Sequence, residues 1–387
     1  MSVTAAPGFA AAGVSAGIRP SGKPDVALVR SLAPAVGCAM WTTNRVQAAP
    51  VTVSRRHLAA VQPQAVVVNA GVANAATGSA GEEDAEHTAA HVAARLGLSP
   101  EEVLVLSTGV IGPRLPMAKL LAGVDEAAVA LSPGGGPSAA EAILTTDASP
   151  KTAVAARDGF TVGGMAKGAG MIHPRLATML AVVTTDHPLD EGEADEFLRP
   201  AVERTFNRIS VDGDCSTNDA VVLLARRADG HTHRATDASF AAALEEVCAD
   251  LARQIVADGE GATVVLEIVV RRASTDEQAR AIALRVATSP LVKTAAFGRD
   301  PNWGRVLAAA GSAPWNGGFA ELDPERLRVS FDGTAVFDGG APTGLVPTLE
   351  GGDATIELDL GLGDGECAYL ASDLSYDYVR LNAEYTT

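Results

Sequence analysis

The sequence predicts a mixed α/β fold in which layered sheets are covered by helices. Short apolar runs have the length of buried strands, and longer stretches between them repeat apolar residues every three or four positions, as amphipathic helices do. The strand-like runs are 25–29, 65–69, 103–107, 179–183, 220–225 and 263–270. The helical patterns are 82–97, 193–207, 239–259 and 276–289. Segments of the two kinds alternate along the chain, which is typical of sheets packed against helices.

In the first half, the runs DVALV, AVVVN and VLVLS are continuously apolar rather than alternating, so we expect several of these strands to be buried on both faces. Glycine and proline are concentrated in SPGGGPS at 132–138. Because helical sequence flanks this segment, it fits a surface connection as well as a domain boundary.

In the second half, Pro200 interrupts the helical pattern of 193–207 and is a candidate break point, because proline lacks the N–H that a helix interior needs. A long helical pattern and a long apolar run follow it. Beyond them, short strand-like segments near 327–331 and 354–361 predict a smaller C-terminal lobe.

The composition is that of a globular protein with few aromatic residues. A length of 387 residues is enough for two or three domains or lobes. Apolar residues make up 47% of the chain and aromatic residues 4%, so close backbone packing must replace ring packing. The formal net charge is −17 and no basic run occurs, which argues against nucleic acid as a partner.

The sequence predicts neither export nor membrane insertion. Residues 1–20 have no cationic segment before an apolar core, and the first positive charge is Arg19. No run approaches the roughly 18 to 20 apolar residues that cross a bilayer. The four cysteines are scattered without CxxC spacing, so we expect neither a zinc site nor a disulfide scaffold. These features predict a soluble, cytoplasmic protein.

Several familiar site motifs are incomplete. Residues 17–24 resemble a phosphate-binding loop, but Pro24 stands where a hydroxyl residue is needed. Residues 212–219 resemble a calcium loop without its glycine and its final glutamate. His87 and His91 lie one helical turn apart without an evident third ligand, so we expect a solvated helix face. No GxSxG elbow occurs, and the sequence therefore predicts no metal site and no serine-triad nucleophile.

The segment KGAGMIHPRLATML at 167–180 has two interpretations. One is a glycine-rich turn that enters a buried strand. In the other, Gly168 and Gly170 permit a strained turn in which the hydroxyl of Thr178 attacks the carbonyl of Ala177. An acyl shift from nitrogen to oxygen then forms an ester, and hydrolysis of the ester leaves Thr178 as a new amino terminus.

An amino-terminal threonine carries its own general base. A free α-amine has a pKa of about 7.7 to 8.0, so part of it is neutral near pH 7 and can take the hydroxyl proton. Such a residue performs acyl transfer without a histidine or a metal ion.

Long motifs along the whole chain favour the second interpretation. The segment GGMAKGAGMIHPRLATML resembles the signature of the ornithine acetyltransferase family, also called glutamate N-acetyltransferases. Further motifs of that family have counterparts at 69–78, 106–112, 144–151, 212–224, 258–263, 289–309 and 374–387. The resemblance implies self-cleavage between Ala177 and Thr178. The products would be an α chain of 1–177 and a β chain of 178–387, the second including the smaller C-terminal lobe.

The resemblance also implies the site residues. Thr178 would be the nucleophile, and Thr108 and Gly109 match the pair that stabilises the oxyanion of the tetrahedral intermediate. The positions that match substrate contacts are Thr145, Lys167, Thr178, Glu260, Asn382 and Thr387. A cation such as Lys167 suits an α-carboxylate, and an acid such as Glu260 suits an ammonium group. Two of these positions lie in the last six residues, so their role requires the C terminus to fold back onto the site.

The implied reaction is a ping-pong acetyl transfer. N-acetylornithine acylates Thr178, ornithine leaves, and glutamate takes the acetyl group. The reaction needs no cofactor, although some family members also use acetyl-CoA as the donor. The family forms a dimer of αβ units, which is a heterotetramer of two α and two β chains.

This sequence departs from the family pattern near the cleavage loop. His173 and Arg175 stand where relatives commonly have small or polar residues, and Ala76 replaces a frequent cysteine. The departures leave open a paralogue with a different acyl donor or acceptor in specialised metabolism. A self-processed amidohydrolase or aminopeptidase that uses water as acceptor is also open, as is a binding protein that remains uncut.

Overall fold

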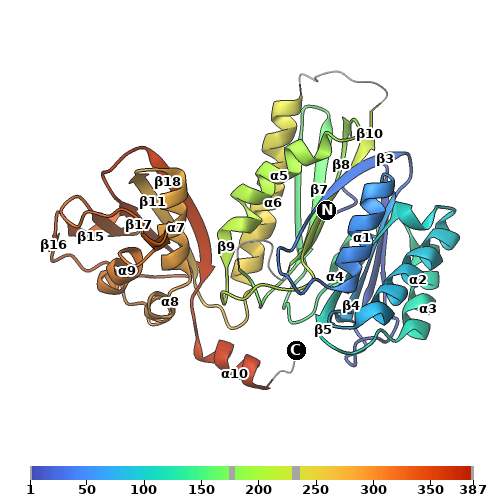
Figure 1. The fold of residues 1–387 in the computed structure, drawn as a ribbon, viewed down its shortest axis with the longest axis horizontal. Coiled ribbons are helices and arrows are strands. Elements are labelled where there is room, and N and C mark those ends of the chain that lie inside the picture. The colour runs from blue at the N-terminus through green and yellow to red at the C-terminus, as the bar shows by residue number, and fades with distance from the viewer. Residues whose placement is uncertain (1, 174–178, 229–235, 385–387) are drawn as a thin grey trace. The chain divides into compact units, whose positions relative to one another are not determined.

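The computed structural model describes residues 2–173, 179–228 and 236–384 (Figure 1). The chain forms two compact units. The first unit is Met1–Asn207 with Asp214–Ile255, and the second is Arg208–Gly213 with Val256–Tyr385. Both units combine helices and strands, which confirms the predicted mixed α/β class. Within the described ranges, no helix has the length and apolar character that crossing a membrane requires.

Two sheets form the centre of the first unit. The four-stranded sheet has the order β1-β2-β4-β5, with β1 (Phe9–Val14), β2 (Val26–Ser31), β4 (Ala65–Val72) and β5 (Val103–Val110). The five-stranded sheet has the order β3-β10-β8-β7-β6, with β3 (Ala35–Trp41), β6 (Lys151–Arg157), β7 (Phe160–Lys167), β8 (Leu180–Leu189) and β10 (Ala220–Arg227). The helices are α1 (Ala49–Ala60), α2 (Gly78–Leu96), α3 (Met117–Ala130), α4 (Gly136–Ala142), α5 (Ala194–Arg204) and α6 (Asp237–Ala257). Short 3₁₀ turns lie at Pro100–Glu102 and Phe206–Arg208.

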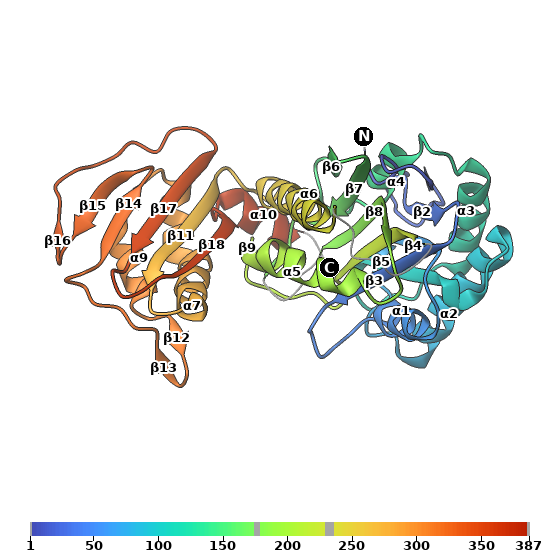
Figure 2. The same cartoon turned by 90° about the horizontal axis from the view of Figure 1, so that it is seen from above.

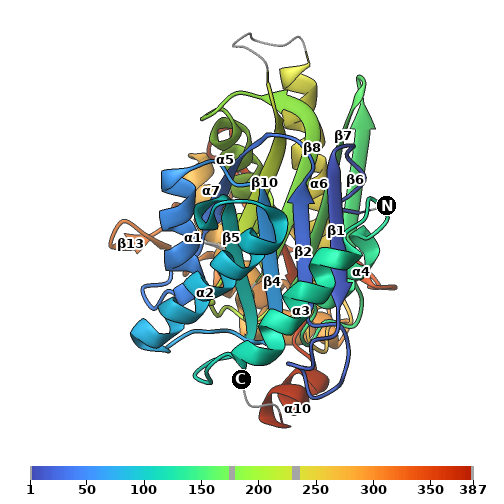
Figure 3. The ribbon, with the colours of Figure 1, turned by 90° about the vertical axis from the view of Figure 1, so that its right-hand side faces the viewer.

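The elements of the first unit stack in four layers, a helix layer on each outer face of the two sheets. Helices α2 and α3 cover the outer face of the four-stranded sheet (Figure 3). Val66 and Val68 of β4 pack in the core between the sheets, whereas Val67 packs in the core under α2 and α3. Helices α5 and α6 cover the other face of the five-stranded sheet (Figure 1). Strand β4 is therefore buried on both faces, as its continuous apolar sequence predicts.

Pro200 does not break its helix. Helix α5 runs unbroken through this residue, so the predicted break point is wrong. Leu198 and Ala201 on either side are buried, and their packing outweighs the hydrogen bond that proline cannot make. Residues 132–135 connect α3 to α4 within the first unit, and Ser132 bridges to Ala11 of β1, whereas residues 136–138 begin α4.

The second unit contains a seven-stranded sheet with helices on one face (Figure 2). Its strand order is β16-β15-β14-β17-β11-β18-β9, with β9 (Ile209–Ser210), β11 (Val265–Ala273), β14 (Arg328–Phe331), β15 (Thr334–Asp338), β16 (Ala341–Pro342), β17 (Asp353–Asp359) and β18 (Gly365–Ser372). The short strands β12 (Pro314–Trp315) and β13 (Gly318–Phe319) pair separately. The helices are α7 (Asp276–Ala287), α8 (Pro290–Phe297), α9 (Trp303–Ala310) and α10 (Tyr376–Glu384).

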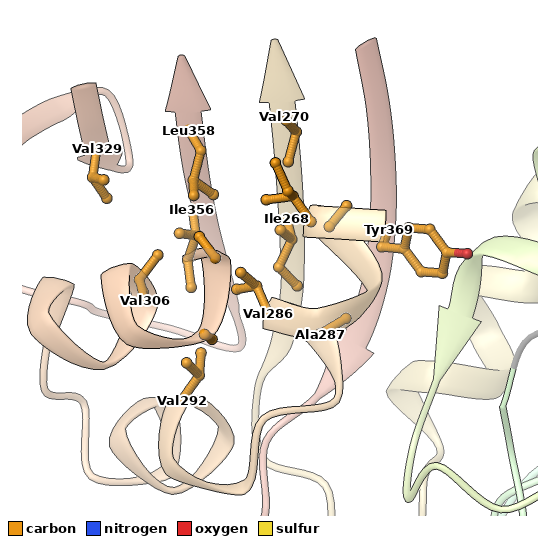
Figure 4. Packing of buried hydrophobic residues seen from close by; sticks show 14 of the residues in the cluster. Ile268, Val270, Val286, Ala287, Val292, Val306, Val329, Ile356, Leu358 and Tyr369 are labelled. Atoms are coloured by element: carbon orange, nitrogen blue, oxygen red, sulfur yellow. The ribbon is translucent and has the colours of Figure 1, made fainter. Parts of the chain in front are cut away.

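Aliphatic side chains fill the core of the second unit (Figure 4). Ile268 of β11 and Ile356 of β17 point from the sheet toward Val286, Val292 and Val306 of the helices (Figure 4). All five side chains are buried. Each fully buried side chain of this size stabilises the fold by about 1.5 to 3 kcal/mol relative to exposure.

Candidate functional site

Three strand ends meet at one edge of the five-stranded sheet in the first unit. Lys167 ends β7 and pairs with Leu180, which begins β8, and Leu180 pairs in turn with Ala220, which begins β10. A hydrogen bond also joins the residues directly before β8 and β10, because the N–H of Met179 donates to Oδ1 of Asp219 at 2.9 Å. The edge therefore places a lysine and a buried acid beside the residue that follows Thr178 in the chain.

A buried carboxylate organises the residues around Lys167. Asp147 lies in the turn between α4 and β6, and its side chain is fully shielded from solvent. It accepts hydrogen bonds from the N–H of Thr145 at 3.0 Å, the N–H of Gly168 at 2.6 Å and Nζ of Lys151 at 2.7 Å. Nζ of Lys167 lies 3.9 Å from the same carboxylate. One side chain thus brings together Thr145 and Lys167, two of the predicted substrate residues.

The neighbouring charges decide the ionisation of Asp147. Burial alone would raise its pKa, but the positive charges of Lys167 and Lys151 hold the pKa of this carboxyl well below its usual range. Hydrogen bonds from Lys151 and Thr145 act in the same direction. Asp147 is therefore an anion at neutral pH, enclosed by cationic and N–H donors.

Asn218 connects the strand edge to the predicted oxyanion pair. Its Nδ2 donates to the carbonyl of Ser107 at 2.9 Å, and Ser107 directly precedes Thr108 in β5. Thr108 is buried, and Gly109 has φ +130°, a conformation that side chains rarely permit. Since Asp219 follows Asn218, two consecutive side chains hold the backbone beside Thr108 and the backbone beside Thr178.

Asp219 differs electrostatically from Asp147. Complete burial raises its pKa well above the ordinary value, against the opposing effects of the Met179 N–H, the charge of Lys167 and the Ser216 hydroxyl. Its Oδ2 has no hydrogen bond of normal geometry to any residue in the described part of the chain. The charge of Lys167 therefore acts on two acids, one that is ionised and one that favours its neutral form.

The second unit brings together Glu260 and Asn382. Nδ2 of Asn382, on α10, donates to Oε2 of Glu260 at 2.9 Å. The start of α10 is fixed to the same turn, because Oγ of Ser375 donates to the carbonyl of Gly261 at 2.6 Å and accepts from the N–H of Tyr378 at 3.2 Å. These two predicted substrate residues are thus neighbours within their own unit.

Four residues singled out in the sequence lie outside the described ranges. They are Ala177 and Thr178 of the predicted cleavage site, Arg175 of the same loop, and Thr387 at the C terminus. His173 is half-buried at the end of a described range.

The sequence gives little warning of Asp147, Asn218 and Asp219, which sequence reasoning missed. The only local signals are an acid four residues before a lysine in DASPK and a pair of polar residues directly before the apolar strand β10. In the loop that resembles a calcium site, the side chains of Asn218 and Asp219 instead form hydrogen bonds with backbone groups of Ser107 and Met179. The backbone groups that these side chains hold at Gly168, Met179 and Ser107 lie 21, 40 and 111 residues away in the sequence, so no local pattern reveals these contacts.

The remaining incomplete motifs have structural explanations. His87 is exposed, as predicted, whereas His91 is half-buried and lies 2.6 Å from Oδ1 of Asp125 on α3. The loop at 17–24 turns around the buried carboxylate of Asp25, which accepts from the N–H of Ile18 at 2.6 Å. The four cysteines are free thiols. In the ranges that the structure describes, no group of His, Cys, Asp and Glu side chains could hold a metal ion.

Comparison with known proteins identifies close relatives along the whole chain. Residues 10–387 match the ArgJ family. The "Arginine biosynthesis bifunctional protein ArgJ" of Thermobifida fusca is 46% identical, over 100% of both chains. The protein of the same name from Mycolicibacterium paratuberculosis is 48% identical, over 100% of this chain and 96% of its own. Among solved structures, ornithine acetyltransferase from Mycobacterium tuberculosis complexed with ornithine is 49% identical, covering 45% of this chain and 94% of its own with a TM-score of 0.44.

Proposed function

Because the chain belongs to the ArgJ family, we propose that it moves an acetyl group from N2-acetylornithine to glutamate in arginine biosynthesis. The acyl carrier is Thr178, which becomes the amino terminus of a β chain, 178–387, after self-cleavage from an α chain, 1–177. One observation carries the proposal. Thr145 and Lys167 both contact the buried carboxylate of Asp147, at the sheet edge where β8 begins two residues after Thr178.

Self-cleavage uses the hydroxyl of Thr178 against the preceding peptide bond. Oγ attacks the carbonyl carbon of Ala177, the C–N bond breaks, and the hydroxyl proton passes to the departing nitrogen. Water then hydrolyses the ester, which gives a carboxylate on Ala177 and a free amine on Thr178. No redox change or metal ion enters either step.

Acetyl transfer uses the same hydroxyl with the new amine as base. The amine takes the Oγ proton while Oγ attacks the acetyl carbonyl of N-acetylornithine, and the proton passes on to the departing ornithine nitrogen. The amine of glutamate then attacks the acetyl-threonine ester, and Oγ regains a proton. Thr108 and Gly109 donate hydrogen bonds to the oxyanion in both steps, and loss of one such donor typically costs about 10²- to 10³-fold in rate.

The remaining residues recognise the amino-acid part of the substrates. Lys167 and Thr145 receive the α-carboxylate that acetylornithine and glutamate share. Glu260, oriented by Asn382, receives an ammonium group, and Thr387 is a further substrate contact. The word "bifunctional" in the relatives' names supports acetyl-CoA as a second acetyl donor. We further propose a cytoplasmic heterotetramer of two α and two β chains that works without a cofactor.

Acetyl transfer with and without glutamate tests this proposal. The purified protein is incubated with N-acetylornithine, and ornithine, N-acetylglutamate and acetate are quantified. We expect ornithine and N-acetylglutamate in equal amounts only when glutamate is present, and neither product with Thr178→Ala. Acetate released at the same rate without glutamate contradicts the transferase and identifies a hydrolase. An uncut, inactive wild-type chain contradicts both.

A further inference from the structure

The cluster around Asp147 is expensive to bury. The side chains of Asp147, Lys151 and Lys167 are 0%, 1% and 3% exposed. Removing an ion from water costs several kcal/mol even after relaxation, and well-packed hydrophobic residues of similar volume are often at least as stable. Stability alone therefore gives little reason for three buried charges at this strand edge.

The contacts of Asp147 point to a positioning role instead. Its carboxylate bonds the backbone of Thr145 and the backbone of Gly168, and it faces the ammonium of Lys167 at 3.9 Å. Lysine is a flexible point charge, so a neighbouring carboxylate fixes where the ammonium lies. Lys151 bonds the other oxygen of the same carboxylate, Oδ1, at 2.7 Å.

We propose that Asp147 is the positioning residue of the substrate-carboxylate site, holding the ammonium of Lys167 and the backbone of Thr145 where they receive the α-carboxylate of an amino acid. This inference rests on the proposed function, which supplies the substrate. Asp147 itself repels a substrate carboxylate and therefore acts through its neighbours rather than by contact. Lys151 partly neutralises Asp147 through Oδ1, so that the site remains attractive to an anion.

The double variant Asp147→Asn/Lys151→Met tests the proposal without leaving an unpaired buried charge at either position. Replacing both partners of a buried pair is often nearly neutral for stability, whereas removing one partner strands the other. The double variant removes the carboxylate at 3.9 Å from Lys167 and leaves Lys167 and Asp219, directly before β10, in place. Asp84→Asn is the matched control, since Asp84 is a buried carboxylate of the same unit bonded by Arg114 at 2.7 and 2.9 Å.

Two readouts are measured between pH 6 and pH 9: ornithine binding by calorimetry, and kcat/KM for glutamate. We expect the double variant to lose about tenfold to a hundredfold in both, the range of one charged hydrogen bond. We also expect the size of the loss to depend on pH, because the double variant removes a charge beside the buried ammonium of Lys167 while Asp219 remains. Maximal turnover of the acetylated enzyme should change less than about threefold, because the lost interaction contributes equally to binding of the substrate and of the transition state. Asp84→Asn should keep the wild-type binding constant and pH profile.

The outcomes separate the two proposals. A wild-type protein that neither binds ornithine nor transfers acetyl groups contradicts the proposed function itself. A wild-type protein that does both, together with a double variant of unchanged affinity and pH profile, overturns the role of Asp147. If the double variant and Asp84→Asn lose activity equally and without pH dependence, Asp147 has only a structural role, which also overturns it.

Discussion

Replacing Gly109 by alanine should damage both the fold and the proposed oxyanion site. Gly109 pairs with Gly71 of the neighbouring strand, and a Cβ added there would lie 2.3 Å from the carbonyl carbon and 2.5 Å from the carbonyl oxygen of Gly71. Ordinary contacts begin near 3.4 Å. The backbone of β4 would therefore have to move by roughly 1 Å in a close-packed interior.

Two terms set the expected magnitude. Alanine at φ +130° costs on the order of 1 to 3 kcal/mol in backbone strain, and forced overpacking adds about 1 to 3 kcal/mol. Gly112→Ala is the matched control, because Gly112 has φ +103° but an added Cβ meets nothing within 4 Å. Gly112→Ala should show the strain term alone.

The assay is urea unfolding of both variants, followed by acetyl transfer at saturating substrate. We expect Gly109→Ala to lose about 1 to 3 kcal/mol more free energy of unfolding than Gly112→Ala. Its kcat should fall by about 10²-fold or more, because an oxyanion donor is displaced. Equal stability and equal kcat in the two variants would refute the close contact between Gly71 and Gly109.

Two further predictions concern buried ionisable groups. Burial raises the folded-state pKa of Asp219 above its unfolded value, so the stability that this group contributes is lost as pH rises from about 4 through the raised pKa. The variant Asp219→Asn keeps an acceptor for the Met179 N–H. Its free energy of unfolding should fall less than that of wild type between pH 5 and pH 8. A variant with the wild-type pH dependence would contradict the raised pKa. Burial lowers the pKa of Lys293 to about 8, so wild type should gain about 3 kcal/mol relative to Lys293→Met as pH rises from about 8 to about 10.5. A difference that is constant over this range, in urea titrations at each pH, would show that Lys293 titrates normally.

The strands that could be predicted are those whose own residues specify burial. The run AVVVN contains three β-branched residues in sequence, and β4 is buried on both faces. By contrast, FAAAGV of β1 consists mainly of small residues without strand preference, and it forms a strand only because β2 pairs with it. The sequence did not predict helix α4 either, because this helix begins within a glycine- and proline-rich segment.

The site divides in the same way. Lys167 and Thr145 could be named from motifs, because a resemblance compares residues position by position. Asp147 could not, because its importance depends on Gly168 and Lys167, which the pairing of β6 with β7 brings beside it. The same is true of Asn218, whose partner Ser107 lies on the other sheet of the first unit. Such long-range contacts follow from the packing of layers and not from local sequence.

The mass of the 178–387 fragment after acid quenching tests the central claim most directly. Wild-type protein is mixed with N-acetylornithine in the absence of glutamate, quenched, and analysed by intact-mass and fragment-mass spectrometry. We predict a 178–387 fragment heavier by one acetyl group, located on the side chain of Thr178, that disappears when glutamate is added before quenching. A single uncut chain, or a cut chain that turns over substrate and never carries an acetyl group on Thr178, would contradict the acyl-threonine mechanism.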